Sequence, residues 1–84
     1  MTKKEITEKI AAEMADTMFV ALFQEKEMLN FPLADNFRTR VVGMVDAAKA
    51  LGIKPNVLSG QAANIYNEKY KPREASLKPR MEVK

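Results

Sequence analysis

The side chains that most often carry out chemistry in proteins are scarce in this sequence. Its 84 residues include no cysteine and no histidine, which excludes disulfides, thiol nucleophiles, imidazole acid-base catalysis and the usual zinc ligands. Carboxylate pairs such as Glu5 with Glu8 and Glu25 with Glu27 lie among lysines in a helical pattern and are expected to face water. The GQAAN segment lacks the lysine and the spacing of a phosphate-binding loop. We therefore expect a protein that is not an enzyme and that holds no cofactor or metal.

The polar side chains with the most specific binding chemistry follow Gly52. Asparagine can form two hydrogen bonds with adenine, and lysine can reach guanine or phosphate. On a helix these side chains would share an outer face without a single acid, and the candidate nucleic-acid-binding residues there are Lys54, Asn56, Ser59, Gly60, Ala63 and Asn64. Candidate phosphate contacts follow further along the chain, at Lys69, Lys71, Arg73, Lys78 and Arg80.

A helical hairpin over residues 47–66 would position the first of these groups. Ala48 can be the small residue where two helices cross, Gly52 the left-handed turn residue and Leu58 the first apolar anchor of the second helix. The segment AAKALGIKPNVLS resembles the helix-turn-helix DNA-binding superfamily, particularly its transposase-like and repressor-like members. The resemblance covers about 20 of the 84 residues and implies that the second helix enters the major groove. Gln61 departs from the superfamily pattern, which usually has an apolar residue there, and a plain helical hairpin is the alternative.

Hydrophobic spacing predicts three helices and no strand, which is an all-α three-helix bundle. The helices are expected at residues 3–29, 34–51 and 56–70, which together form a domain over residues 1–70. Residues 71–84 contain two units that begin Lys-Pro-Arg, and their prolines and charges predict a basic extended tail.

Local signals predict how these helices begin and end. Thr2 with Glu5 three residues later is typical of a capping box at the start of the first helix. The second helix begins either with Asp35 as its N-cap or with Pro32 in its first turn. Gly52 is expected to end that helix in a left-handed conformation. Leu51, just before it, is expected to be the last core residue of the second helix.

Between residues 18 and 23, apolar side chains lie on every face of the first helix. A small bundle cannot bury all of these faces. The candidate protein interface is therefore Met18, Phe19, Leu22 and Phe23. Through it the chain could dock on a partner protein or form a homodimer along the first helix. The alternative is a break in the helix near residues 24–27 that folds Phe19 and Phe23 into the core.

The net charge of +3 is unevenly distributed. Residues 1–52 hold seven Lys/Arg and eight Asp/Glu, a net charge of −1, whereas residues 53–84 hold seven and three, a net charge of +4. The basic part suggests an acidic partner such as nucleic acid or an acidic protein surface, and a solvated tail is the alternative. Within this part Tyr66 and Tyr70 could stack on bases or close one end of the core.

Composition also indicates location. A secreted domain of this size would usually carry cysteines, so we expect a cytoplasmic protein. The charged start lacks the apolar core of a signal peptide, and the longest apolar run, residues 18–23, is far shorter than the ~20 residues that cross a bilayer. Membrane association is therefore not expected.

The patterns together favour a small, non-enzymatic DNA-binding regulatory protein that uses a helix-turn-helix-like unit and a basic tail, with a dimer through the first helix. The alternative is a small protein-binding module or inhibitor, of phage or plasmid type, that docks through Met18–Phe23. The two hypotheses depend on different residues, Lys54 and Asn56 for DNA and Phe19 and Phe23 for a protein partner.

Overall fold

The computed structural model describes residues 2–77, and within this range the chain forms helices and no strand. The elements are α1 (Lys3–Lys26), α2 (Phe31–Ala50), α3 (Pro55–Ile65), a π-helical turn η1 (Tyr66–Tyr70) and a short α4 (Lys71–Glu74). The predicted all-α, three-helix architecture is thus confirmed.

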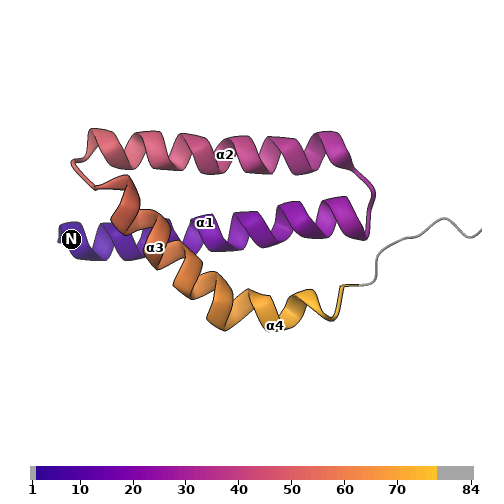
Figure 1. Cartoon of the computed structure of the whole chain (residues 1–84). Helices are drawn as coiled ribbons and strands as arrows, with labels where there is room; N and C mark the ends of the chain where they lie inside the picture. Colours follow the sequence, from indigo (N-terminus) through magenta and orange to yellow (C-terminus); the bar gives the residue numbers. More distant parts are fainter. Residues whose placement is uncertain (1, 78–84) are drawn as a thin grey trace, which may run out of the picture.

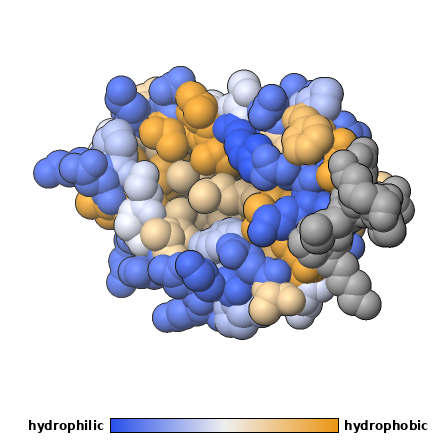
Figure 2. Space-filling view, turned by 45° about the vertical axis from the view of Figure 1, so that its right-hand side comes forward, coloured by the Kyte–Doolittle hydropathy of each residue, from blue (hydrophilic) through white to orange (hydrophobic). Residues whose placement is uncertain are grey.

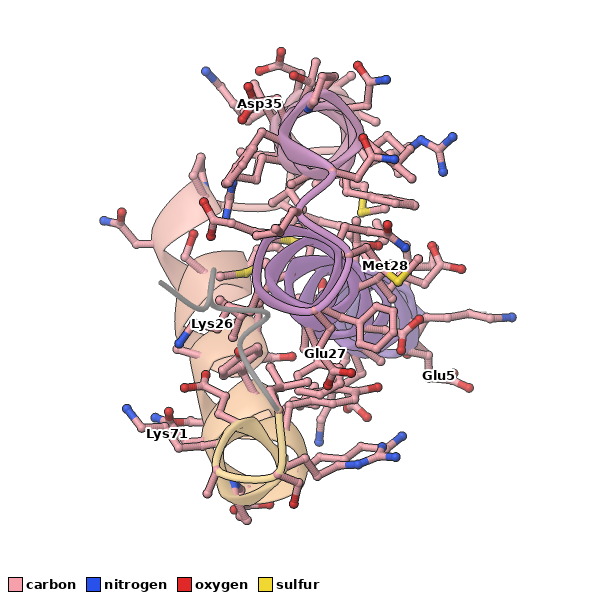
Figure 3. All side chains as sticks on the ribbon, turned by 90° about the vertical axis from the view of Figure 1, so that its right-hand side faces the viewer. Glu5, Lys26, Glu27, Met28, Asp35 and Lys71 are labelled. Carbon is pink, nitrogen blue, oxygen red and sulfur yellow. The ribbon has the colours of Figure 1, made fainter. Side chains whose placement is uncertain are left out.

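The first two helices form an antiparallel hairpin, and α3 crosses in front of α1 (Figure 1). Viewed along the hairpin, α1 lies between α2 on one side and the segment from α3 to α4 on the other (Figure 3). The inner position of α1 explains why its apolar residues face two directions.

The N-terminus of α1 has the predicted capping box. The Oγ1 of Thr2 accepts a hydrogen bond from the backbone N–H of Glu5 at 3.1 Å, and the Oε1 of Glu5 accepts one from the backbone N–H of Thr2 at 3.0 Å. These bonds satisfy two of the donors that a helix start leaves unpaired. α1 ends at Lys26, three residues before the expected boundary and within the region where the alternative placed a break. Phe19 and Phe23 lie on the intact helix before this end.

The connection between α1 and α2 is four residues long and fixes both helix ends. The backbone N–H of Asn30 bonds to the carbonyl of Gln24 at 2.8 Å across Leu29, which is left-handed at φ 52°. The side chain of Asn30 then caps α2 by accepting from the N–H of Leu33 at 3.2 Å, with Pro32 in the first turn. The second helix therefore starts three residues before the expected boundary, and Asp35 is not its N-cap.

Alanines dominate the buried contacts between the helices. Six of the ten buried apolar residues in the described range are alanines, none of them more than 3% exposed: Ala11, Ala15, Ala21, Ala34, Ala48 and Ala62. Because an alanine projects only a methyl group, the helix backbones can approach closely. We refer to these six residues as the alanine seam.

The larger core side chains gather where α1 meets the α2–α3 turn. Leu58 is fully buried and packs with Met14 and Ile53, which are each 4% exposed. Leu51, expected to be the last core residue of α2, is instead 59% exposed. It is the C-cap residue, with φ −88° and ψ 3°, and after this bend in the backbone Ile53 enters the core in its place.

The C-terminal part of the described chain remains helical beyond the expected boundary. The N–H of Lys71 bonds to the carbonyl of Tyr66, five residues back, and α4 follows with Pro72 in its first turn. Proline is tolerated there because the N–H it lacks would have no partner within the helix. The segment that begins at Lys71 is therefore helical as far as Glu74, not extended. Lys78 and Arg80 lie outside the described residues.

The two tyrosines of η1 close one end of the core. Tyr70 is 5% exposed, its ring stacks on Phe19 with centroids 5.1 Å apart, and its hydroxyl donates to the Oδ1 of Asp16 at 2.9 Å. The Tyr66 hydroxyl donates to the Oε2 of Glu74. Packing, the second of the two alternatives for this pair, therefore accounts for both rings.

Candidate nucleic-acid interface

The turn between α2 and α3 has the local geometry that the sequence predicts. Gly52 is left-handed at φ 82°, and its N–H bonds to the carbonyl of Lys49 at 2.9 Å. The N–H of Ile53 then bonds to the carbonyl of Ala48 at 3.0 Å, and both of these residues are buried. The turn therefore fixes the direction in which α3 leaves α2. A plain helical hairpin would share this geometry, so the superfamily assignment stays a prediction.

The outer face of α3 is open to solvent. Its inner face is buried through Leu58 and Ala62, and the helix lies on the outside of the α1–α2 hairpin (Figure 1). All six candidate residues of the segment are exposed: Lys54, Asn56, Ser59, Gly60, Ala63 and Asn64. Gln61 is half-buried on the flank, and Ala62 supplies the buried contact that the superfamily pattern would place at Gln61.

A basic pocket beside α3 was missed in the sequence. In Figure 1 the N-terminus of α1 lies at the same end of the molecule as the α2–α3 turn. This brings Lys3 and Lys4 next to Lys54, about fifty positions later in the sequence. The pocket has a volume of about 330 Å³, and its lining residues are Lys3, Lys4, Thr7, Gly52, Ile53, Lys54, Val57 and Gln61. We call it the lysine pocket.

The charge of the lysine pocket is not balanced by its own lining, which contains no carboxylate. Within residues 2–77 the ion pairs involve Arg38 with Glu25 and Asp35, and none involves the three lysines of the pocket. The charge pattern of the N-terminal half gave no signal for this cluster, since acids outnumber bases by one over residues 1–52. Only the packing of α1 against the turn creates it.

The described basic residues beyond α3 are also exposed. Lys69 lies over the ring of Tyr70 at 5.5 Å, and Arg73 lies over the ring of Phe19 at 5.7 Å. Lys71 points away from the bundle (Figure 3). These three side chains follow the C-terminal end of α3, whereas Lys54 precedes its N-terminal end, so the structure separates the basic groups along the helix.

A second concave surface lies over α1, between α2 and the η1–α4 segment. This apolar groove has a volume of about 450 Å³ and is lined by Met18, Leu22, Lys26, Arg38, Val41, Tyr66 and Glu74. Figure 2 shows hydrophobic side chains in a hollow between hydrophilic rims.

The four candidate interface residues are not all brought together in the apolar groove. Met18, 44% exposed, and Leu22 line it. Phe19 instead packs on Tyr70, and Phe23 is half-buried and does not line the groove.

The hydroxyl of Tyr66 at the groove is a hydrogen-bond donor. Burial raises the pKa of Tyr66 well above its usual value near 10, and the hydrogen bond to Glu74 raises it further. Burial and the bond to Asp16 likewise raise the pKa of Tyr70. Neither hydroxyl can serve as a base at neutral pH.

Comparisons of the chain with protein-family models, with curated proteins and with solved structures gave no match. No helix in residues 2–77 is both long and apolar enough to cross a membrane. In the same range no group of three acidic side chains is arranged to hold a metal ion. The geometry of α3 and its flanks is therefore the basis for the function proposed next.

Proposed function

We propose that the chain is a small DNA-binding regulatory protein that places α3 in the major groove of a duplex. The observation that carries the proposal is the outer face of α3, which is exposed and free of acids from Lys54 to Asn64. An acid-free face suits a helix in the groove because the phosphates that border the groove are negatively charged and repel carboxylates.

The dimensions and side chains of α3 fit this role. An α-helix with its side chains is about 10–12 Å wide, and the major groove is about 12 Å wide. Ser59, Gly60 and Ala63 are small, so the helix backbone can approach the base edges. Asn56 and Asn64 lie on the same outer face and can each make two hydrogen bonds with adenine. Because only a few long polar side chains reach outward, the proposal includes weak sequence discrimination.

The test is fluorescence anisotropy with a labelled mixed-sequence duplex at low and moderate salt. The variant Asn56→Ala/Asn64→Ala removes the candidate base contacts, and Asn36→Ala removes an exposed asparagine of α2 as a control. We expect wild type and Asn36→Ala to bind alike. The double variant should bind more weakly than both, since a bidentate contact contributes about 1–3 kcal/mol wherever an adenine is within reach. Circular dichroism confirms that all three proteins are folded. Absence of binding by wild type at low salt would overturn the proposal.

The apolar groove supports a second candidate, a protein-binding module that takes an amphipathic helix of a partner. Met18, which is 44% exposed, and Lys26 both line the groove. Apolar residues at i, i+3 and i+7 of such a helix would enter the groove. Selection of displayed peptides against wild type and against Met18→Lys tests this candidate. Helical peptides that bind only the wild type would support it, and a selection that yields no such peptide would exclude it.

A further inference from the structure

The role proposed for α3 leaves the lysine pocket without a use. We propose that Lys3, Lys4 and Lys54 bind a backbone phosphate of the DNA strand that borders the groove occupied by α3. This inference rests on the proposed function and deepens it, because it adds the first turn of α1 to the DNA-binding surface.

The position of the pocket on α3 is the first argument. Lys54, Val57 and Gln61 line it at a spacing of three and four residues, which places them along one flank of the helix. The outer face with Asn56 and Asn64 is adjacent to this flank. A helix about 10–12 Å wide fills a groove about 12 Å wide, so each flank must lie close to a sugar-phosphate strand. The flank that carries the pocket would therefore meet phosphates.

The electrostatics of the pocket are the second argument. Three lysines from two segments far apart in the sequence line one cavity of about 330 Å³, and no carboxylate is among its lining residues. Like charges repel, so this arrangement stabilises the fold less than a paired one and favours an anionic ligand. Glu5, the acid in the first turn of α1, accepts a hydrogen bond from the backbone N–H of Thr2 in the capping box.

Gly52 provides the space for one of these lysines. A Cβ added at Gly52 would stand 3.3 Å from the Nζ of Lys3 and 3.8 Å from its Cε. The absence of a side chain thus lets the Lys3 ammonium lie across the α2–α3 turn, at the base of α3. The same glycine that sets the direction of α3 also allows the ammonium group of α1 to approach it.

The experiment compares Lys3→Gln/Lys4→Gln with Lys9→Gln/Arg40→Gln, which removes two charges from exposed positions outside the lysine pocket and the apolar groove. Affinity for the labelled duplex is measured between about 50 and 200 mM salt, where each phosphate contact contributes about 0.9 to the slope of log K against log salt. We expect the pocket variant to lose about 0.9–1.8 of this slope. The ratio of wild-type affinity to variant affinity should therefore fall about three- to fourfold per lost contact as the salt rises over that range. The control variant should keep nearly the wild-type slope.

The outcomes separate the inference from the function on which it rests. Wild-type binding with the same slope in the pocket variant as in the control would overturn the inference and leave the proposed function standing. Absence of wild-type binding at low salt would overturn both. The Asn56→Ala/Asn64→Ala variant should lose affinity with its salt slope unchanged, because base contacts release no counterions. A reduced slope in the pocket variant alone is the supporting result.

Discussion

Replacing glycine by alanine should have opposite effects at two positions of this chain. Gly52 is left-handed at φ 82°, where an alanine side chain costs about 1–2 kcal/mol. Gly60 lies inside α3, and a Cβ there would meet nothing within 4 Å. Alanine is favoured over glycine in a helix interior by about 0.5–1 kcal/mol. Gly52→Ala should therefore lower the free energy of unfolding and Gly60→Ala should raise it.

The predicted difference in stability between Gly52→Ala and Gly60→Ala is large enough to measure. The two effects differ by about 1.5–3 kcal/mol, and in a domain of this size 1 kcal/mol moves the melting temperature by about 4–8 °C. At Gly52 the nearest atoms belong to the end of the Lys3 side chain, which can move aside, so backbone strain accounts for most of the loss.

Thermal and urea unfolding followed by circular dichroism provide the assay. Gly43→Ala is the matched control, since Gly43 lies in α2 with nothing within 4 Å of an added Cβ and should behave like Gly60. If Gly52→Ala were as stable as wild type while the other two variants gained stability, the assigned role of the left-handed turn would be wrong. A lower free energy of unfolding in all three variants would instead contradict the finding that an added Cβ meets no neighbour at Gly43 and Gly60.

The remaining predictions concern the core, the tyrosines and the first helix start. Leu58→Ala should cost about 2–5 kcal/mol in urea unfolding, a large share of the roughly 4–13 kcal/mol expected for a chain of this length, because Leu58 is fully buried. The pKa values of Tyr66 and Tyr70 are raised in the folded state, so stability should be full below pH 10 and fall as the pH rises further. Replacing both by phenylalanine should remove this dependence, as seen in unfolding midpoints and in tyrosinate absorbance. The pKa of Glu5 is lowered chiefly by its bond to the Thr2 backbone, so its contribution should be lost as the pH falls below about 4.5, and Glu5→Gln should remove this acid dependence.

Local signals in the sequence were sufficient where the stabilising contacts are also local. The capping box of Thr2 and Glu5 and the left-handed turn at Gly52 each depend on residues within a few positions, and the structure has both. The sequence allows two starts for α2, and the structure has the one with Pro32 in the first turn. The sequence pattern does not predict Asn30 as the cap. The backbone N–H of Asn30 bonds to the end of α1, and its side chain caps the start of α2. Helical periodicity does not indicate a residue with this double role.

Contacts between distant segments explain what the sequence did not reveal. The approach of Lys3 to Lys54 depends on how α1 packs against the α2–α3 turn, and no spacing rule connects them. The exposure of Leu51 follows from the backbone bend at the C-cap, although its position continues the apolar stripe of α2. Exposure of the outer face of α3 was predictable, because Leu58 and Ala62 define the opposite face.

The alanine seam reverses the usual pattern of mutational tolerance in a protein interior. In most cores the large side chains are the sensitive positions, because shortening them leaves a cavity. Here Ala21 and Ala34 have no exposed surface, and an added methylene in such a packed contact costs about 1–3 kcal/mol. A deep mutational scan should therefore find that these positions accept only glycine or serine, whereas half-buried residues such as Val45 accept many apolar replacements. Homologues of this chain would then be recognised by the spacing of their smallest residues, with the half-buried larger apolar positions free to change.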